Sequence, residues 1–426
     1  MRPAGDRALF VEFDTQVSAT ELHARAAAIR AQRGVLACIV GQRSLYVICD
    51  GEPNVDFDVT SHAAFSPRTH RIEVNFDGPE MRDEFRPFVD GLHLTARYLG
   101  FRAGFAYLDG WPKQFALPRR PTSRPVTRGT FGIAGAVAGF YNVDSPGGWN
   151  LLGSTDALLW DARRTPPNLI EAGDEIVIAA VDRAMSPPAN IEELPLSIDG
   201  VSIEGGYVTV VTLPDYSRIA SGRSPGGAFD EEMAIAANRA VGNADDAPVI
   251  ECAMLGPRVR FSSRRAVAWF GADCDLPNGE AFVCSELSVG RIRNGLRGWL
   301  AVGPVEDGRP RMSGQARRLS STGIIRIVPG PHEPSISHLE CEVTSQLNRV
   351  GIRLRPLQSL DIEAPADLPS CGMQFGTIQL HPDGSLVAMG PDHGITGGYV
   401  QPMTVRWDER WKLAQLAPGE RVLFAV

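Results

Sequence analysis

The sequence predicts a mainly β protein that opens with an α+β unit. The stretch 100–153 is too rich in glycine, proline and aromatic residues for a helix. Its short apolar runs are separated by Gly or Pro every 5–12 residues. That pattern is typical of a small barrel or sandwich of short strands. The length of 426 residues corresponds to about three domains.

The two halves of the chain end in one repeated pattern. LIEAGDEIVIAAV (169–181) and QLAPGERVLFAV (415–426) both place a glycine and an acid before an apolar strand. Each follows a Gly-Gly-aromatic element, and each of those follows a Phe-Gly strand start. Chance similarity among glycine-rich turns is the alternative explanation. We interpret the repeat as two copies of one β module.

Composition excludes several classes of function. A net charge of −8 argues against a nucleic-acid surface, and no apolar run approaches the ~20 residues of a membrane span. Acids interrupt the first apolar stretch, so no signal peptide is expected. Seven scattered cysteines and eight histidines show no ligand spacing, which predicts reduced thiols, no metal site and a cytoplasmic protein.

The chain contains only two lysines, Lys113 and Lys412. Neither lies in the G-K-[ST] context of a phosphate-binding loop, and neither has the Met-Lys-Met context in which biotin is attached. We therefore expect no covalently bound cofactor. Chemistry that uses ATP or biotin would need a partner chain.

The elements of the first half follow from apolar runs and breaker residues. Residues 1–75 read as an α/β unit, with strands at 9–13, 45–49 and 71–76 and a helix from an N-cap at Thr20 to Gly34. An amphipathic helix is expected at 79–93. A hairpin that ends in a closing strand is expected at 169–178. Residues 183–200 contain adjacent prolines and no periodicity, so we place the main boundary there.

One helix is expected in the second half. Asp230, Glu231 and Glu232 would supply acids to its first turn, where they favour the helix dipole, and Gly242 would end it. Gly222-Arg223-Ser224-Pro225-Gly226 matches the G-x-S-x-G of serine hydrolases. However, Pro225 lacks the backbone N–H that such a site needs after the nucleophile, so we reject that reading.

Motifs in both halves resemble known families. GFRAGFAYL, the PR…R segment, GTFGIAG and SPGGWNLLG resemble the KipI-like family, also called allophanate hydrolase subunit 1. GRSPGGAFD, ANRAVGN, IECAMLGPRVRF and the stretch 375–399 resemble the KipA-like family, or allophanate hydrolase subunit 2. The chain thus looks like a fusion of the two. The resemblance implies cyclophilin-like barrels, one in the first half and two in the second, with domains at 1–75, 76–185 and 201–426.

Several motif positions depart from the family patterns. Ala103 and Ser123 stand where the KipI-like family has proline, Val137-Ala138 replace a Gln-Thr pair, and Ser154 replaces an arginine. The GSRST that follows the GLRGWLAVG-type element in the KipA-like family is missing. A diverged chain without catalysis is therefore one alternative.

The basic segment 118–125 is the leading candidate for a binding site. Arg119 and Arg124 lie on a proline-braced loop, which suits bidentate capture of a carboxylate or phosphate, although a solvated loop is the alternative. Gly147 and Gly148 would let backbone N–H groups approach an oxyanion, or would simply form a tight turn. His393 could titrate near neutrality, or be solvated.

With the family patterns behind them, these residues form one candidate set. We name Arg119 and Asp392 as candidate catalytic residues. The candidate substrate-binding residues are Arg124, Gly147, Gly148, Trp149, Arg349, Gln379, Thr396, Gly397, Gly398 and Tyr399.

The resemblance implies two enzymatic activities and one regulatory role. The first is ATP-dependent opening of 5-oxoproline with a separate LamB/YcsF-type subunit. The second is carboxyl transfer from carboxybiotin to urea, with a biotin carboxylase or carrier chain as partner. The third is non-catalytic inhibition of a kinase. Both reactions act on a planar amide, next to an anionic group that arginines and backbone donors can hold. The missing biotin segments favour the first, and a homodimer is a further expectation.

Overall fold

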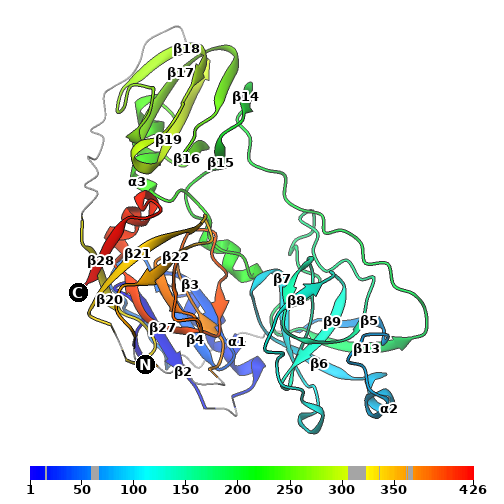
Figure 1. Cartoon of the computed structure of the whole chain (residues 1–426). Coiled ribbons are helices and arrows are strands. Elements are labelled where there is room, and N and C mark those ends of the chain that lie inside the picture. The colour runs from blue at the N-terminus through cyan, green and yellow to red at the C-terminus, as the bar shows by residue number, and fades with distance from the viewer. Residues whose placement is uncertain (15–16, 59–66, 306–322, 335, 361, 363–367) are drawn as a thin grey trace.

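The structure, a computed structural model, describes residues 1–14, 17–58, 67–305, 323–334, 336–360, 362 and 368–426. Most described elements are β-strands, arranged in three lobes (Figure 1). Two lobes contain closed barrels and the third is an open sheet. The predicted class, mainly β with an α+β opening unit, is confirmed. No helix among the described residues is long and apolar enough to cross a membrane.

The N-terminal unit is a four-stranded antiparallel sheet of order β1-β2-β4-β3 with one helix. The helix begins at Ser18 rather than Thr20, because the Ser18 hydroxyl accepts a hydrogen bond from the Glu21 N–H at 3.1 Å. The elements are β1 (Arg2–Pro3), β2 (Ala8–Glu12), α1 (Ala19–Arg30), β3 (Val35–Val40) and β4 (Ser44–Cys49).

The first barrel closes through a parallel pair between its first and last strands, β5 and β13. The barrel therefore begins at Thr69, within the range 1–75 that the sequence pattern had assigned to the opening unit. Its strands are β5 (Thr69–Asn75), β6 (His93–Gly100), β7 (Arg102–Asp109), β9 (Thr130–Ala134), β10 (Val137–Phe140), β12 (Asn150–Ser154) and β13 (Glu175–Val181).

Short elements complete the first lobe. The helix expected at 79–93 is reduced to a 3₁₀ turn and one α-helical turn, because Pro87 cannot lie inside a longer helix. A separate two-stranded ribbon pairs β8 with β11. These elements are η1 (Asp83–Phe85), α2 (Arg86–Val89), η2 (Lys113–Phe115), β8 (Arg124–Val126) and β11 (Ser145–Gly147).

The second barrel repeats the topology of the first. When the strands of each barrel are numbered from 1 in chain order, both close in the order 1-6-4-5-3-2-7 with strands 1 and 7 parallel. A two-stranded ribbon, β23 with β26, again lies outside the barrel. This shared order confirms that both halves end in one type of module. The elements are β20 (Ile325–Pro329), β21 (His338–Leu347), β22 (Gly351–Pro356), β23 (Cys371–Gly372), β24 (Thr377–Leu380), β25 (Leu386–Met389), β26 (Thr396–Gly397), β27 (Val400–Val405), η4 (Trp407–Gln415) and β28 (Arg421–Ala425).

The third lobe is a six-stranded sheet that stays open in the described part of the chain, where we expected a third barrel. Helix α3 covers it and begins as predicted, since the Asp230 carboxylate accepts from the Met233 N–H at 3.1 Å. The elements are β14 (Val201–Glu204), β15 (Tyr207–Val211), η3 (Tyr216–Ser221), α3 (Glu231–Ala240), β16 (Val249–Ala253), β17 (Arg258–Asp273), β18 (Ala281–Ser288) and β19 (Arg293–Val305).

The N-terminal unit bridges the two barrels. Its helix contacts the first barrel, where the His23 ring bonds to the Arg97 carbonyl at 2.8 Å. Its sheet packs on the second half in one buried cluster with Ile219, Cys371 and Ile395. The Gln42 backbone touches both sides. Its N–H donates to the Ser370 carbonyl at 2.8 Å, and its carbonyl accepts from Arg97 Nε at 2.8 Å. This unit fixes the spacing between the barrels.

Candidate functional site

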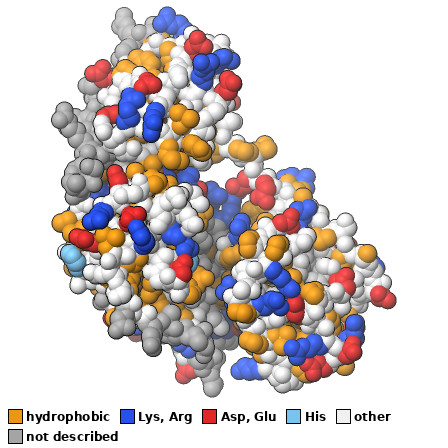
Figure 2. Space-filling view, in the orientation of Figure 1, with side chains coloured by type: hydrophobic (Ala, Val, Ile, Leu, Met, Phe, Trp, Pro, Cys, Tyr) orange, Lys and Arg blue, Asp and Glu red, His pale blue; other side chains and the backbone are white. Residues whose placement is uncertain are grey.

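A cleft of about 1510 Å³ separates the two barrels, and residues of both line it. Figure 2 shows the groove between the two lower lobes of the molecule. Of the twelve site residues predicted from the sequence, the structure brings ten into this lining. They are Arg119, Gly147, Gly148, Trp149, Gln379, Asp392, Thr396, Gly397, Gly398 and Tyr399.

Arg119 is held on the first side of the cleft by the backbone around it. The Pro118 carbonyl accepts from the buried Asn150 amide at 3.0 Å, and the Arg120 N–H donates to the Gly148 carbonyl at 2.8 Å. A Cβ at position 148 would lie 3.1 Å from Arg119 Nε, so the glycine makes room for the side chain. Arg119 has no ion pair among those the structure shows for the described residues. Its charge is thus available to a ligand.

An aromatic wall lies beside Arg119. Phe105, Tyr107, Tyr141 and Trp149 contact one another edge-on, with ring centroids 5.0 to 6.2 Å apart. Burial raises the pKa of both tyrosines, and the positive charge of Arg119 opposes that rise. Both phenols therefore remain protonated at neutral pH and can donate hydrogen bonds. A flat, partly apolar ligand would fit against this wall.

Arg124 points away from the cleft. Its guanidinium pairs with Glu80, whose other oxygen also meets Arg120 at 3.3 Å. Burial alone would raise the pKa of Glu80, but the hydrogen bonds from Arg124 and the Leu151 N–H, together with the charges of Arg124 and Arg120, outweigh it and the pKa is lowered. Because β8 pairs Arg124 with Gly147, this ion pair fixes the loop that carries Arg119. Arg124 thus lies outside the lining.

The second barrel presents an equivalent rim. Gly397 pairs with Cys371 in the β23–β26 ribbon, as Gly147 pairs with Arg124 in the first barrel. The rim carries three buried polar atoms that have no hydrogen-bond partner among the described residues. Buried polar groups are rarely left unpaired, so these atoms mark places where a ligand or water is needed. They are Gln379 Nε2, His381 Nε2 and Thr396 Oγ1.

His381 stacks on Tyr399 with ring centroids 4.4 Å apart. Burial lowers the pKa of His381, and the charge of Arg353 lowers it further. The ring is therefore neutral at neutral pH and offers one donor or one acceptor. His381 was not among the predicted site residues, because the stack joins two separate segments and only the folded barrel brings them together.

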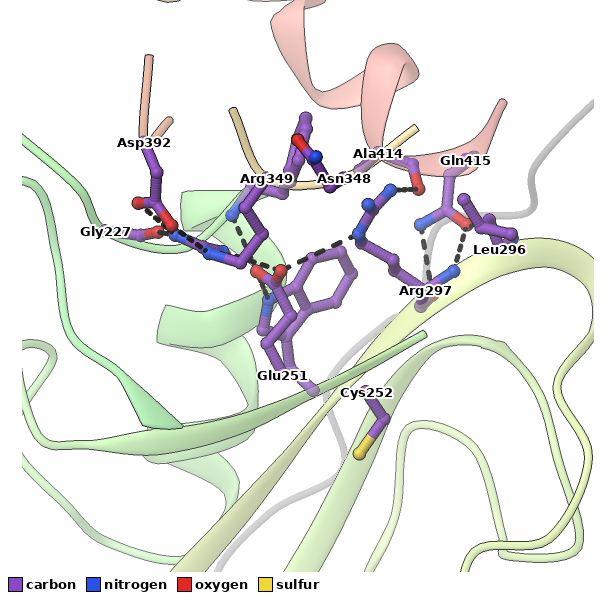
Figure 3. A network of polar contacts seen from close by, with 12 residues as sticks. Gly227, Glu251, Cys252, Leu296, Arg297, Asn348, Arg349, Asp392, Ala414 and Gln415 are labelled. Carbon is purple, nitrogen blue, oxygen red and sulfur yellow. Dashed lines mark hydrogen bonds and ion pairs between the residues drawn. The ribbon is translucent and has the colours of Figure 1, made fainter. Parts of the chain in front are cut away.

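Asp392 lines the cleft but is already paired. Arg349 donates to both of its oxygens at 2.8 and 2.9 Å, and to Glu251 at 2.7 Å (Figure 3). Arg349 also donates to the Gly227 carbonyl at 2.6 Å. Arg349 itself lies behind the lining and joins the open sheet to the rim of the second barrel. The two hydrogen bonds from Arg349 hold the Asp392 carboxylate in position at the cleft.

Arg297 completes the buried network on the other side of Glu251. It lies 3.7 Å from that carboxylate, donates to the Ala414 carbonyl at 3.0 Å and covers the Phe229 ring. Burial lowers the pKa of Arg297 to about 10. Glu251 also accepts from the Trp299 indole at 3.0 Å. One carboxylate therefore holds two arginines in the interior.

His393 is neither solvated nor a titrating group near neutrality. It is buried at 2% exposure, and its Nδ1 lies 2.7 Å from the Gly394 carbonyl. Burial lowers its pKa to about 4, so the ring is neutral at neutral pH. The sequence left two interpretations open, a ring that titrates near neutral pH and a solvated ring. The structure contradicts both, because the loop that carries His393 is packed inside the molecule.

The cleft collects positive charge in an acidic protein. Its lining contains five arginines and three acids, although the whole chain has a net charge of −8. One of those acids, Asp392, is neutralised by Arg349. The described residues include no group of three or more His, Cys, Asp or Glu side chains that could hold a metal ion. The site therefore favours a small anion.

The geometry defines a class of protein, in which paired β-barrels present glycine-lined rims to one shared cleft. Two family models match the chain: "Carboxyltransferase domain, subdomain C and D" at residues 89–170, and "Carboxyltransferase domain, subdomain A and B" at 221–322 and 305–426. Together they span more than half of the chain. The chain belongs to the carboxyltransferase-domain family, as a fused KipI-like and KipA-like protein.

Known proteins match each half separately. The chain is 35% identical over 126 residues to the B subunit of 5-oxoprolinase from Bacillus subtilis, covering 28% of this chain and 50% of that protein. It is 26% identical over 274 residues to the C subunit of 5-oxoprolinase from Escherichia coli strain K12, covering 52% and 88%. The chain thus spans half or less of the length of the relatives that match its first half.

A solved structure matches the whole architecture. The crystal structure of TTHA0988 superimposes with a TM-score of 0.82 and 26% identity, covering 99% of this chain and all of that chain. The arrangement of two barrels, an open sheet and an N-terminal unit is therefore shared by another single chain.

Proposed function

We propose that this chain is a component of an ATP-dependent amidohydrolase of the 5-oxoprolinase type, which binds a small cyclic amide carboxylate in the cleft between the barrels. One observation carries the proposal. The cleft is lined jointly by two halves, each of which is related to a different subunit of 5-oxoprolinase. A site built from both halves explains why the two are joined.

The two rims suit the two ends of such a substrate. On the first rim, Arg119 offers a guanidinium without an ion pair in the described structure, which matches a carboxylate in a bidentate geometry. On the second rim, Gln379 Nε2 and Thr396 Oγ1 are buried donors that need partners. They can hold the amide oxygen as negative charge develops on it, and donors fixed in advance are worth most there. The aromatic wall receives the flat ring.

The remaining components come from other chains. We expect a LamB/YcsF-type subunit to complete the enzyme and to supply the ATP chemistry. Neither Lys113 nor Lys412 lies in the Met-Lys-Met context in which biotin is attached, so we expect no biotin on this chain. Biotin would take part only on a separate carrier.

The test measures glutamate release from 5-oxoproline and ATP by the purified chain with such a partner. Arg119→Ala should lower kcat/KM by about 100-fold, or about 2.7 kcal/mol, which is the scale of a charge-assisted hydrogen-bond pair. Arg120→Ala is the matched control, because Arg120 is the neighbouring arginine and lies outside the cleft lining. Full activity of Arg119→Ala, or an equal loss in both variants, would contradict the assignment.

Carboxyl transfer is the second candidate, because the matching family models describe carboxyltransferase subdomains. The same cleft would then accept a planar amide and a carboxybiotin delivered by a separate chain. Incubating the protein with a carboxybiotin donor and urea distinguishes the two. Carboxylated urea without ATP consumption would favour transfer, and glutamate formation with ATP consumption favours the hydrolase.

A further inference from the structure

A second group of donors lies in the cleft, apart from Arg119. Arg218, on η3, and Arg223, on the loop that follows, both contact the carboxylate of Glu193. Arg223 Nη1 meets one carboxylate oxygen, and Arg218 Nη2 lies 3.6 Å from the other. All three residues line the cleft. One carboxylate is therefore clasped by two guanidinium groups.

Arg223 is positioned independently of that carboxylate. Its Nε donates to the Ser221 hydroxyl at 3.0 Å, and its guanidinium covers the ring of Trp160 at 5.4 Å. Its side chain is only 17% exposed. A planar guanidinium held in this way keeps its orientation when its partner leaves.

The group has more donors than Glu193 can satisfy. Arg218 Nε and Trp160 Nε1 are buried and have no hydrogen-bond partner in the part of the chain that the structure describes. Trp160 is 3% exposed and lines the cleft. Buried donors without acceptors are costly. An oxyanion with several acceptor atoms would satisfy them better than one side-chain carboxylate does.

Glu193 belongs to the linker between the two halves, and apart from the two arginines little packs against it. The last backbone hydrogen bonds before Glu193 join Ile191 to Trp160 and Ala162 of the first half. One residue after Glu193, Leu194 is 91% exposed, and Leu196 is 50% exposed. The Glu193 side chain can therefore swing out without disturbing a packed element.

We infer that Arg218, Arg223 and Trp160 form a second oxyanion subsite, which Glu193 occupies intramolecularly and which a phosphate or carboxylate group of a ligand takes by displacing it. The subsite adjoins the second rim. Arg218 Nη1 and Asp392 Oδ1 lie 3.5 and 3.8 Å from the point where a Cβ at Gly226 would be. An anion bound there would lie beside the rim of the second barrel. The inference does not depend on which reaction the chain performs.

The test is calorimetric titration of the full-length chain with sodium pyrophosphate and, separately, with sodium acetate at low ionic strength. Glu193→Gln removes the competing charge and should tighten binding of one of these probes about tenfold. Glu192→Gln is the matched control, since it removes the same charge from the adjacent residue, which also lines the cleft. Its affinity should equal that of the wild type.

Adding Arg223→Gln to Glu193→Gln should abolish the gain, since it removes the guanidinium that the structure holds in place. Tightening for pyrophosphate identifies a phosphate ligand, and tightening for acetate alone identifies a carboxylate; both support the subsite. Equal affinities of wild type and Glu193→Gln for both probes would overturn the inference. An equal gain in Glu192→Gln would also overturn it, because that result would reflect net charge alone.

Discussion

Arg119 owes its position to a glycine. Gly148 leaves the space that Arg119 Nε fills, and a methyl group there would lie 3.1 Å from it. Contacts this short force one side to move by a few tenths of an ångström. The arginine is the side that can move, because Gly148 is fixed by its backbone bond to Arg120. A single added methyl group at Gly148 is thus enough to displace the Arg119 side chain.

Gly148→Ala should therefore weaken substrate binding without unfolding the protein. We expect KM for 5-oxoproline to rise about tenfold with little change in kcat, since displacement of Arg119 removes ground-state and transition-state binding alike. The check is a double-mutant cycle with Arg119→Ala. Once Arg119 is absent, Gly148→Ala should have no further effect. Additive losses would show that the glycine acts elsewhere.

His393 makes a separate prediction at the same scale. Burial holds its pKa at about 4, whereas in the unfolded chain it returns to about 6.5. Between pH 6.5 and pH 4 the His393 ring binds a proton in the unfolded state but not in the folded state. The free energy of unfolding therefore falls as the pH drops from 6.5 to 4. His393 should account for roughly 1.4 kcal/mol per pH unit within that window.

Urea unfolding of wild type and His393→Asn between pH 7 and pH 4 checks this expectation. The variant should lose part of the acid-dependent slope, although His23 and His332, whose pKa values burial also lowers to about 4, keep the rest. Identical slopes for the two proteins would show that burial does not lower the pKa of His393 in the folded state.

At the scale of elements, one buried carboxylate joins three parts of the fold. Glu251 on β16 pairs with Arg349, behind the rim of the second barrel, and with Arg297 on β19 of the open sheet (Figure 3). It also accepts from the Phe229 N–H at 2.8 Å, just before α3. Removing one partner of a buried network leaves charges uncompensated, which costs more than the pair itself contributes.

Glu251→Gln should lower the free energy of unfolding by about 3 kcal/mol, since the buried Arg297 loses the carboxylate beside it and Arg349 keeps only Asp392. Urea unfolding monitored by tryptophan fluorescence measures the loss, and Trp299 beside the network is one of the reporters. Glu204→Gln, at an exposed position of β14, is the control and should change stability by less than about 0.5 kcal/mol. Equal midpoints for both variants would contradict this account of the network.

Local patterns predicted the elements better than their partners. The strands at 9–13 and 45–49 were predicted from apolar runs, and the start of α3 from Asp230. Of the hairpin expected at 169–178, only the closing strand forms, as β13. The parallel pairing of β5 with β13 was not predicted, because it joins residues about a hundred positions apart. The sequence of neither strand alone indicates which strand it pairs with. The rims were predicted from their glycines. The second anion subsite was not, because a linker residue completes it.

At the scale of the whole molecule, the two halves contact each other well beyond the linker. The N-terminal unit meets the second barrel, where Thr404 Oγ1 donates to the Ala4 carbonyl at 3.2 Å and the Trp407 N–H meets Asp6 at 3.1 Å. The rims also touch directly. A Cβ at Gly100 would collide with the Thr396 side chain, so the barrels approach as closely as glycine allows.

These contacts predict that the halves stay together when the linker is cut. A protease site introduced at Leu194, where the chain is exposed, would separate residues 1–194 from 195–426. We expect the cleaved protein to elute in gel filtration as one species of about 46 kDa, the mass of the intact chain. A matched site in an exposed turn within one half, at Gly384, controls for cleavage itself. Dissociation into two peaks would show that the linker, rather than the bridging N-terminal unit, holds the cleft together, and the cleft would then depend on covalent fusion. If the cleaved protein stays together as one species, the covalent fusion only ensures that the two halves are made in a one-to-one ratio. The contacts between the halves then fix the geometry of the site.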